Sequence, residues 1–151
     1  MTSAYPLTGY HFQVDFLLPK LNKPVNAQFA EIVGGFSTSI SYGEKNEGPA
    51  TLLYSDLVLK RGVVTDDSLL EWFNSHRQSY RLPIPVLVSV LDGTGGALRS
   101  WCFLNAYPVK WSTTGFNASQ GQVLYEEITL RYESYRIVTT GETASLKQKA
   151  G

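Results

Sequence analysis

Cysteine and histidine are scarce in this sequence, whose 151 residues include one cysteine, Cys102, and two histidines. A lone cysteine cannot build an internal disulfide framework or a cysteine-rich metal site. Neither histidine belongs to a set of residues with the spacing of metal ligands. We therefore expect no metal and no other cofactor.

A surplus of charge is also missing, because 13 basic and 13 acidic residues cancel. Binding to nucleic acid in general needs clustered positive charge facing the phosphates, so we do not expect it. No apolar run approaches the roughly 20 residues that a membrane helix needs. The N-terminus has no basic stretch followed by an apolar run, as a secretion signal would. We expect a protein that is made in the cytoplasm and does not insert into a membrane by itself.

Patterns typical of enzymes are lacking too. Residues 93–96, GTGG, have neither the lysine nor the following helix of a phosphate loop, and they predict a hairpin turn. Asp66-Asp67 stands where helix caps stand. Glu126 and Glu127 alternate along an expected strand, so they point to opposite faces and cannot share a proton. The sequence therefore predicts a protein that is not an enzyme.

What the chain does have is alternation of apolar and polar residues, which indicates half-buried strands. Strands are expected at residues 12–18, 27–33, 36–42, 51–60, 86–91, 98–106, 109–113 and 123–138. In the last of these, Ile128, Leu130 and Tyr132 are expected to face the core. The residues expected to face outward are Glu127, Thr129, Arg131 and Glu133. We expect one domain over residues 1–151, with an arm at 1–8 and a frayed tail at 139–151.

One segment has a helical pattern. Gly62 is expected to end the preceding strand, because glycine adopts positive φ at little cost. Residues 65–68 are good helix starters, and Ser68 with Glu71 has the spacing of a capping box. Residues 69, 70 and 73 then form an apolar stripe that should lie on a sheet. The fold class is therefore mainly β, a sandwich or barrel with one helix packed on it.

Three polar stretches leave alternatives open. The most polar internal segment ends at Ala50 and begins with Gly43, Glu44, Lys45, Asn46, Glu47, Gly48 and Pro49. It is either a solvated hairpin loop or a protruding arm that touches a partner subunit. Lys60-Arg61 and Lys110-Trp111 either carry solvated edge charges or pair with acids across a subunit interface.

Four segments, in this order, resemble one known family. They are Tyr5-Pro6-Leu7 with residues 9–14, Leu59-Lys60-Arg61-Gly62 followed by residues 69–73, Trp101-x-Phe103-x-Asn105-Ala106-Tyr107-Pro108-x-Lys110-Trp111, and residues 126–133. The family is that of the inner tail-tube proteins of contractile phage tails and extracellular contractile injection systems. The resemblance covers roughly residues 5–138.

The resemblance implies a structural subunit that forms hexameric rings. Six sheets would join into a continuous barrel around a lumen, and rings would stack into a tube inside a contractile sheath. The polar side chains that would line this lumen are Glu127, Thr129, Arg131 and Glu133, together with the row of Ser37, Ser39 and Ser41. It implies self-assembly as well as a sheath and a spike or baseplate protein as partners. The particle would assemble in the cytoplasm and act as a phage tail or an extracellular injection machine. Residues that would lie at the subunit interface or form the family motif are Lys60, Arg61, Gly62, Trp72, Trp101, Asn105, Pro108 and Lys110.

Within the family, two roles remain open. Tube subunits usually carry a long arm between the third and fourth strands that contacts the adjacent ring, whereas residues 43–50 form a short segment. The alternative is a tube-initiator ring, which joins the spike to the tube. We favour the tube subunit because it is the commoner role. From the residues alone, a monomeric ligand-binding β-barrel is an alternative of another class, suggested by the 13% aromatic content.

Overall fold

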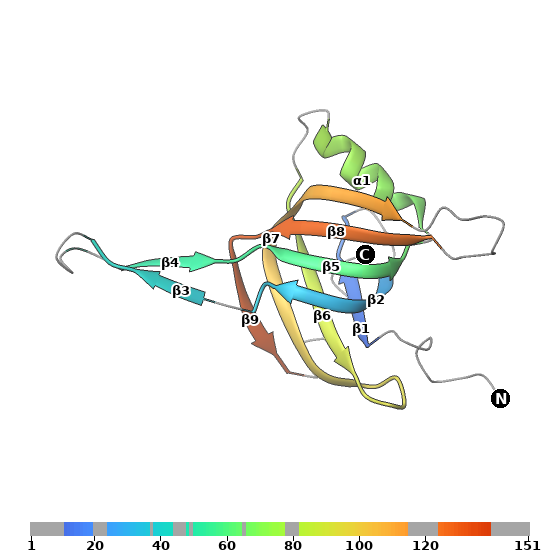
Figure 1. Cartoon of the computed structure of the whole chain (residues 1–151), viewed down its shortest axis with the longest axis horizontal. Coiled ribbons are helices and arrows are strands. Elements are labelled where there is room, and N and C mark those ends of the chain that lie inside the picture. Colours follow the sequence, from blue (N-terminus) through green and yellow to red (C-terminus); the bar gives the residue numbers. More distant parts are fainter. Residues whose placement is uncertain are drawn as a thin grey trace.

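The protein, described here from a computed structural model, is built mainly from antiparallel strands (Figure 1). The structure describes residues 11–19, 24–36, 38–43, 48, 50–64, 66–77, 82–114 and 124–139. Its elements in chain order are β1 (Phe12–Phe16), β2 (Val25–Gly34), β3 (Thr38–Ser41), β4 (Thr51–Tyr54), β5 (Leu57–Val63), α1 (Asp67–Arg77), β6 (Ile84–Leu91), β7 (Ala97–Thr114), β8 (Tyr125–Arg131) and β9 (Ser134–Val138).

Six of the strands close into a barrel. They pair in the order β6-β1-β2-β5-β8-β7, and β7 returns to pair with β6. The first half of β7 lies between β6 and β9, and its second half pairs with β8. The sequence predicted a break at Tyr107-Pro108, and this prediction is wrong. Pro108 lies opposite Leu130 within β7, beside a register shift of the kind where proline is tolerated in a sheet.

The barrel interior is filled with apolar side chains. The largest fully buried ones include Phe16, Phe29, Phe103, Leu57, Leu59, Ile128 and Leu130. The predicted inward orientation of Ile128 and Leu130 is confirmed, because they are 1% and 0% exposed. A ligand-binding barrel needs an open apolar cavity in its interior. The packing of the described residues therefore gives that alternative no support.

The helix is confirmed, but its details differ from the prediction. Asp66 caps it by accepting a hydrogen bond from the backbone N–H of Ser68 at 2.8 Å. Ser68 thus lies inside the helix, and the predicted capping box at this residue is wrong. The buried stripe consists of Leu69 and Trp72, whereas Leu70 is 45% exposed. No helix in the described part of the chain has the length and apolar character that a membrane crossing requires.

Two predicted strands are each divided by a bend. The strand expected over residues 51–60 is split at Ser55-Asp56 into β4 and β5. The strand expected over residues 123–138 is split at Tyr132-Glu133 into β8 and β9. At each bend two polar residues stand together, Ser55-Asp56 and Glu133-Ser134, and the apolar positions change phase across them. The prediction of two continuous strands is therefore wrong at these points.

The glycine-rich turn after β6 is confirmed as a hairpin turn. The Asp92 carboxylate accepts hydrogen bonds from the Thr94 hydroxyl at 2.6 Å and from the backbone N–H groups of Thr94 at 2.7 Å and Gly96 at 3.0 Å. The Thr94 hydroxyl, followed by the backbone N–H of the same residue, holds the pKa of Asp92 below its ordinary value. The backbone N–H groups that a phosphate loop would present to a phosphate donate here to the Asp92 carboxylate of the same chain.

Candidate assembly surfaces

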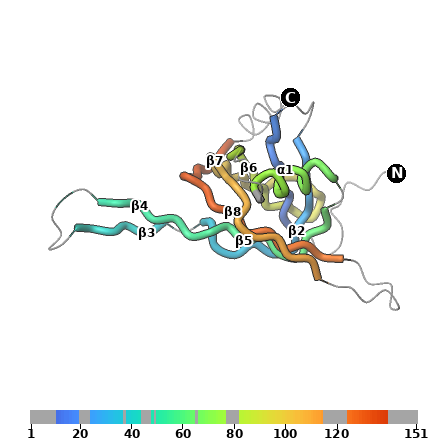
Figure 2. The backbone as a smooth tube through the Cα atoms, turned by 90° about the horizontal axis from the view of Figure 1, so that it is seen from above, coloured from blue at the N-terminus to red at the C-terminus, as the bar shows by residue number. Residues whose placement is uncertain are grey.

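The most prominent surface feature is a two-stranded arm that projects away from the barrel (Figures 1 and 2). It consists of β3 and β4, which form a sheet of their own. Within the described residues these two strands pair only with each other, from Thr38 opposite Tyr54 to Ser41 opposite Thr51. An isolated hairpin is marginally stable in water. The arm therefore depends on contacts at its base or with another chain.

The two faces of the arm differ in chemistry. Ile40 lies opposite Leu52, and each is 53% exposed. Tyr42 follows on the same face with 59% exposure. The other face carries Ser39, Ser41 and Thr51, with Leu53 among them. A contiguous exposed apolar row of this kind marks an interaction surface.

The arm explains the apparent shortness of residues 43–50. The arm also includes β3 and β4, which precede and follow that segment in the sequence, so the expectation of a short arm is wrong. Gly43 and Gly48 are described and exposed. Glu44, Lys45, Asn46, Glu47 and Pro49 lie outside the described residues, and their role as inter-ring contacts stays a prediction. The predicted serine row also changes place, because Ser39 and Ser41 lie on the arm and not on the barrel.

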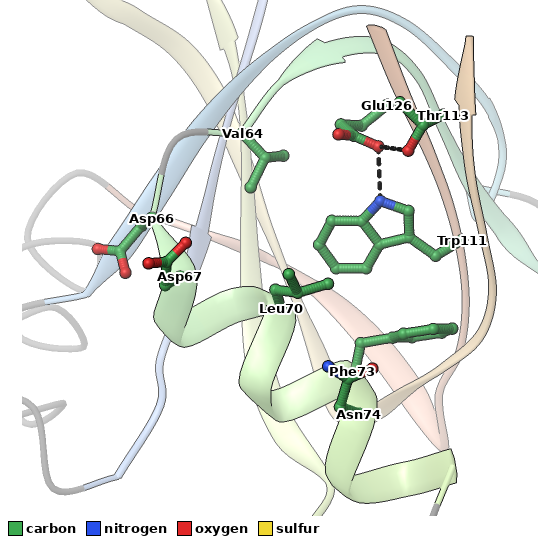
Figure 3. Close-up of a pocket in the computed structure, with 9 residues that line it drawn as sticks. All are labelled: Val64, Asp66, Asp67, Leu70, Phe73, Asn74, Trp111, Thr113 and Glu126. Carbon is green, nitrogen blue, oxygen red and sulfur yellow. Dashed lines mark hydrogen bonds between the residues drawn. The ribbon is translucent and has the colours of Figure 1, made fainter. Parts of the chain in front are cut away.

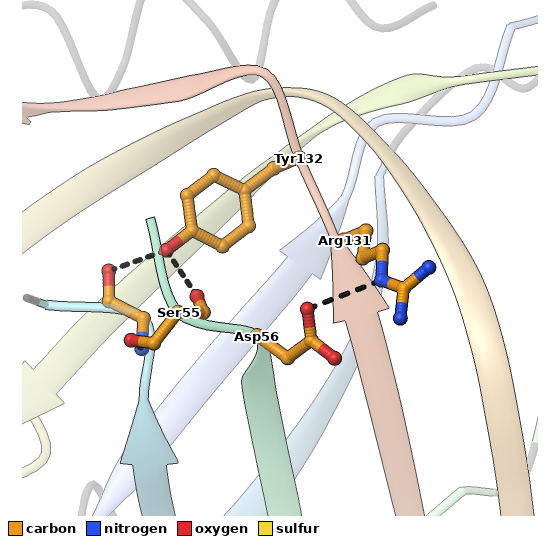
Figure 4. Close-up of polar contacts among 5 residues, drawn as sticks. Ser55, Asp56, Arg131 and Tyr132 are labelled. Carbon is orange, nitrogen blue, oxygen red and sulfur yellow. Dashed lines mark hydrogen bonds and ion pairs between the residues drawn. The ribbon is translucent and has the colours of Figure 1, made fainter. Parts of the chain in front are cut away.

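The base of the arm is held by polar contacts with the end of β8 (Figure 4). The Tyr132 hydroxyl donates to the backbone oxygen of Ser55 at 2.5 Å and lies 3.3 Å from that of Gly35. Arg131 forms an ion pair with Asp56 at 3.3 Å. Burial, followed by the nearby Tyr135, raises the pKa of Tyr132 to about 12. The hydroxyl is therefore a neutral donor over the whole physiological range.

A second surface lies where β9 ends the sheet. In the described part of the chain β9 pairs only with β7, so it forms an edge of the described sheet. Two large apolar side chains are exposed beside it, Leu98 at 68% and Ile137 at 59%. They line a hollow of about 340 Å³. An open edge with exposed apolar side chains suits pairing with another chain.

The strand-to-helix motif has a structural explanation that the sequence did not reveal. Gly62 lies within β5 and does not end it, so the predicted break is wrong. A Cβ atom at Gly62 would lie 2.2 Å from Cε1 of Phe29, which means that only glycine allows this ring to cross the strand. The positive φ belongs to Arg61, at 54°, where the register of β5 against β8 shifts. Exposed Arg61 pairs with Glu31 at 3.6 Å within the chain, and Lys60 is half-buried.

The second motif also includes a strained residue. Asn105 has a φ of 53°, in the left-handed region that asparagine tolerates better than most residues. It lies where the register of β7 against β6 shifts, and its side-chain amide donates to the Glu133 carboxylate. Trp101 packs on Phe36 with ring centroids 4.8 Å apart. Two further residues of this motif were predicted at the subunit interface, and of these Pro108 is buried and Lys110 is exposed.

Trp72 packs the helix onto the barrel. It is 5% exposed, and its indole N–H donates to the backbone oxygen of Leu82 at 2.8 Å. Its ring centroid lies 6.1 Å from that of Phe16 in the core. Trp72 is therefore a packing residue within the subunit, and its predicted place at a subunit interface stays a prediction.

A hollow of about 270 Å³ lies beside the start of the helix (Figure 3). It is lined by Val64, Asp66, Asp67, Leu70, Phe73, Asn74, Trp111, Thr113 and Glu126. One oxygen of Glu126 accepts hydrogen bonds from the Trp111 indole N–H and the Thr113 hydroxyl, both at 2.6 Å. The Phe73 and Trp111 rings meet edge to face. Glu126 thus ties β7 to β8 below the helix.

The predicted lumen-facing row lies on the outside of the barrel wall. Glu127 and Thr129 are half-buried and Arg131 and Glu133 are exposed, while Ile128 and Leu130 between them are buried. The row carries charges of both signs, two acids and one base. One end of this row lies next to the base of the arm, because Arg131 pairs with Asp56 there. Whether it faces a lumen stays a prediction.

Comparison with known proteins identifies similar chains. The sequence matches the family described as T4-like virus tail tube protein gp19 over residues 8–136. No curated protein matches it. Among solved structures, a chain of the anti-feeding prophage baseplate is 22% identical with a TM-score of 0.59, and the match covers 91% of this chain and 97% of that one.

Two further solved structures are similar in fold. A chain from the sheath-tube complex of an extracellular contractile injection system, PVC, in the extended state is 19% identical with a TM-score of 0.54, covering 90% of this chain and 93% of that one. Hcp1 from Flavobacterium johnsoniae is 11% identical with a TM-score of 0.58, covering 85% and 94%. At these identities the likeness establishes a shared fold.

Proposed function

Because the chain belongs to the T4-like virus tail tube protein family, we propose that it is a subunit of the inner tube of a contractile phage tail or injection machine. Six copies form a ring around a central lumen, and the rings stack into a tube. A contracting sheath drives this tube through a target envelope. The subunit is a structural protein in this role and catalyses no reaction.

The observation that carries this proposal is the arm with its exposed apolar row. Ile40, Leu52 and Tyr42 are each more than half exposed, although side chains of this kind are usually buried. The arm stands clear of the barrel that provides its support (Figure 2). An arm of this kind fits the contact between one ring and the next, where the apolar row is covered by a neighbouring subunit. Residues 43–49, which join β3 to β4 in the sequence, are part of the same contact.

The remaining surfaces fit the other contacts of a tube subunit. The open edge of β9 suits pairing with the neighbour in the ring, since closure of a ring leaves no free edge. The outward row of Glu127, Thr129, Arg131 and Glu133 lines the lumen, because a passage for cargo needs a polar wall. Lys110 and the ion-paired Arg61 belong to the contact surface between subunits.

The partners of the assembled tube are the sheath protein and a spike or baseplate protein. The similar chain in the PVC particle belongs to a sheath-tube complex, which supports a sheath as partner here. Rings assemble in the cytoplasm and then become part of a phage tail or an extracellular particle.

A second role within the same family is that of a tube-initiator ring between spike and tube. It is favoured by the similar chain in the anti-feeding prophage baseplate. An initiator ring meets a spike on one side and a tube ring on the other, so it would form rings without forming long tubes by itself. The two roles therefore differ in what the purified chain assembles into.

Negative-stain electron microscopy of the concentrated protein, with light scattering on the same sample, tests both roles. Long hollow tubes are the expected result for a tube subunit. Isolated rings, or rings that form only on a spike protein, would assign the initiator role. A protein that remains monomeric at high concentration and with its sheath and spike partners would contradict both.

A further inference from the structure

Two short connections join the arm to the barrel, one at Gly34-Gly35 after β2 and one at Ser55-Asp56 between β4 and β5. We call them the links, and they are in close contact with each other. Gly34 and Gly35, at the end of β2, have φ values of 69° and 76°. A Cβ atom at Gly34 would lie 2.3 Å from the backbone oxygen of Asp56 in the other link. The N–H of Gly35 donates to the Ser55 hydroxyl at 3.1 Å. The two links therefore leave each other little room to move separately.

A third element, the bend between β8 and β9, bonds to both links. The Tyr132 hydroxyl donates to the backbone oxygen of Ser55 in one link and lies within reach of that of Gly35 in the other (Figure 4). Beside it, Arg131 pairs with Asp56. This bend belongs to the barrel, because β8 and β9 both pair with β7. The links are thus fixed to the barrel as well as to each other.

The contacts extend past the links to the first residue pair of the arm. The hydroxyl groups of Tyr135 and Thr38 lie 3.1 Å apart, within hydrogen-bond distance. The Tyr54 ring, opposite Thr38, has its centroid 5.8 Å from that of Tyr132 and 5.7 Å from that of Tyr135. Both of these rings rest on Phe103 of the core, at 4.8 and 5.5 Å. Because the barrel contacts both the links and the first residue pair of the arm, the angle between arm and barrel is fixed. Contacts at the links alone would leave the arm free to rotate about them.

We infer that Tyr132 and Tyr135 are positioning residues that hold the arm at a fixed direction relative to the barrel. Six arms can engage a neighbouring ring together only if they point in equivalent directions. If the direction of the arm is already fixed when the subunit folds, stacking of rings does not have to supply the free energy of ordering the arm. The benefit for ring stacking rests on the proposed function. The fixed direction of the arm is a property of one subunit and can be tested without it.

The direction of the arm can be measured in the isolated subunit. Spin labels on Ser41→Cys in the arm and Arg99→Cys on the barrel, in a Cys102→Ala background, report the distribution of distances between the two sites. Both labelled positions are exposed. We expect a narrow distribution in the parent and a broader one in Tyr132→Phe/Tyr135→Phe, which loses the two hydroxyl groups and keeps the rings. Tyr125→Phe changes an exposed tyrosine that makes none of these contacts with the arm, so it is the matched control and should leave the distribution narrow.

An unchanged distribution in the double variant would overturn the inference. If the double variant does not fold, Thr38→Val removes the partner of Tyr135 without touching the core, and the same criterion applies to it. Electron microscopy of the double variant supplies the second readout, in which rings should persist while tubes become shorter. If the parent forms neither rings nor tubes, the proposed function fails, but the label distances still decide the role of the two tyrosines.

Discussion

The barrel and the arm are built from the same kind of strand and differ in what covers the apolar row. In the barrel, the apolar side chains of β1, β5 and β8 point into one core and are almost fully buried. In the arm, Ile40 and Tyr42 alternate with serines and Leu52 lies opposite Ile40, yet Ile40 and Leu52 are each 53% exposed. The comparison shows that alternation of apolar and polar residues predicts that the apolar face of a strand is covered. It does not tell whether the same chain or another chain covers that face. The barrel covers its own apolar faces, whereas in the proposed tube the row on the arm is covered by a neighbouring subunit.

Trp72→Ala should have the largest effect on the stability of the barrel. Removing this buried ring leaves a cavity beneath the helix and an unpaired backbone oxygen at Leu82, so we expect a loss of about 3–5 kcal/mol in the free energy of unfolding. Denaturant unfolding measures it. Leu70→Ala on the same helix is the control and should cost much less, because Leu70 is 45% exposed. Equal losses would mean that the helix is not packed as described.

Gly62→Ala should have the next largest effect. The added methyl group would meet the Phe29 ring, and overpacking of a core typically costs about 1–3 kcal/mol. Gly93→Ala is the matched control, since a Cβ atom there meets nothing within 4 Å. Thermal unfolding of the two variants compares them directly. A stable Gly62→Ala variant would show that Phe29 moves freely aside.

Alkaline pH tests the junction between the two regions. The pKa of Tyr132 is about 12 in the folded protein against an ordinary value of 10.0. The unfolded chain therefore releases this proton first, and the stability that the neutral hydroxyl contributes is complete below pH 10. It is lost as the pH rises from about 10 toward 12. Unfolding measured across this range should show a weaker decline in Tyr132→Phe than in Tyr125→Phe.

Substitutions on the arm should barely affect the stability of the subunit. Ile40→Ser with Leu52→Ser exposes no core, so we expect a change below about 0.5 kcal/mol for each. Assembly should respond instead, with tubes lost and rings retained in electron microscopy. Ser39→Ala with Ser41→Ala changes the other face and should leave tubes intact. Tubes of normal length in the apolar-row variant would mean that this face stays exposed in the particle.

The sequence predicted those parts of the fold that follow from local pattern. The helix near residues 67–77, the inward orientation of Ile128 and Leu130, and the turn at Asp92 are confirmed because each depends on neighbouring residues. The bends at Ser55-Asp56 and Tyr132-Glu133 were not predicted, although two adjacent polar residues interrupt the alternation at each. A polar pair on a half-buried strand does not by itself distinguish a bend from a continuous strand, so β4 was predicted as part of one strand with β5.

Long-range contacts account for the remaining errors. Gly62 was expected to end a strand, but its need for glycine comes from Phe29, which is 33 positions earlier in the sequence. Leu70 was placed on the buried stripe because helical spacing alone does not say how the helix is rotated on the barrel. The tyrosine contacts at the base of the arm join residues 97 and 77 positions apart, and no sequence motif signals them.

The exposed row on the arm also has a consequence for the cell that makes this protein. Two-stranded ribbons with free edges and an uncovered apolar face are prone to aggregate while they wait for a partner. If the chain builds the proposed tube, the pool of unassembled subunits must therefore stay small relative to the growing ends of tubes that take them up. Overproduction of this chain alone should yield inclusion bodies or spontaneous polymers, and the supply of subunits should be matched to the rate at which new particles are begun.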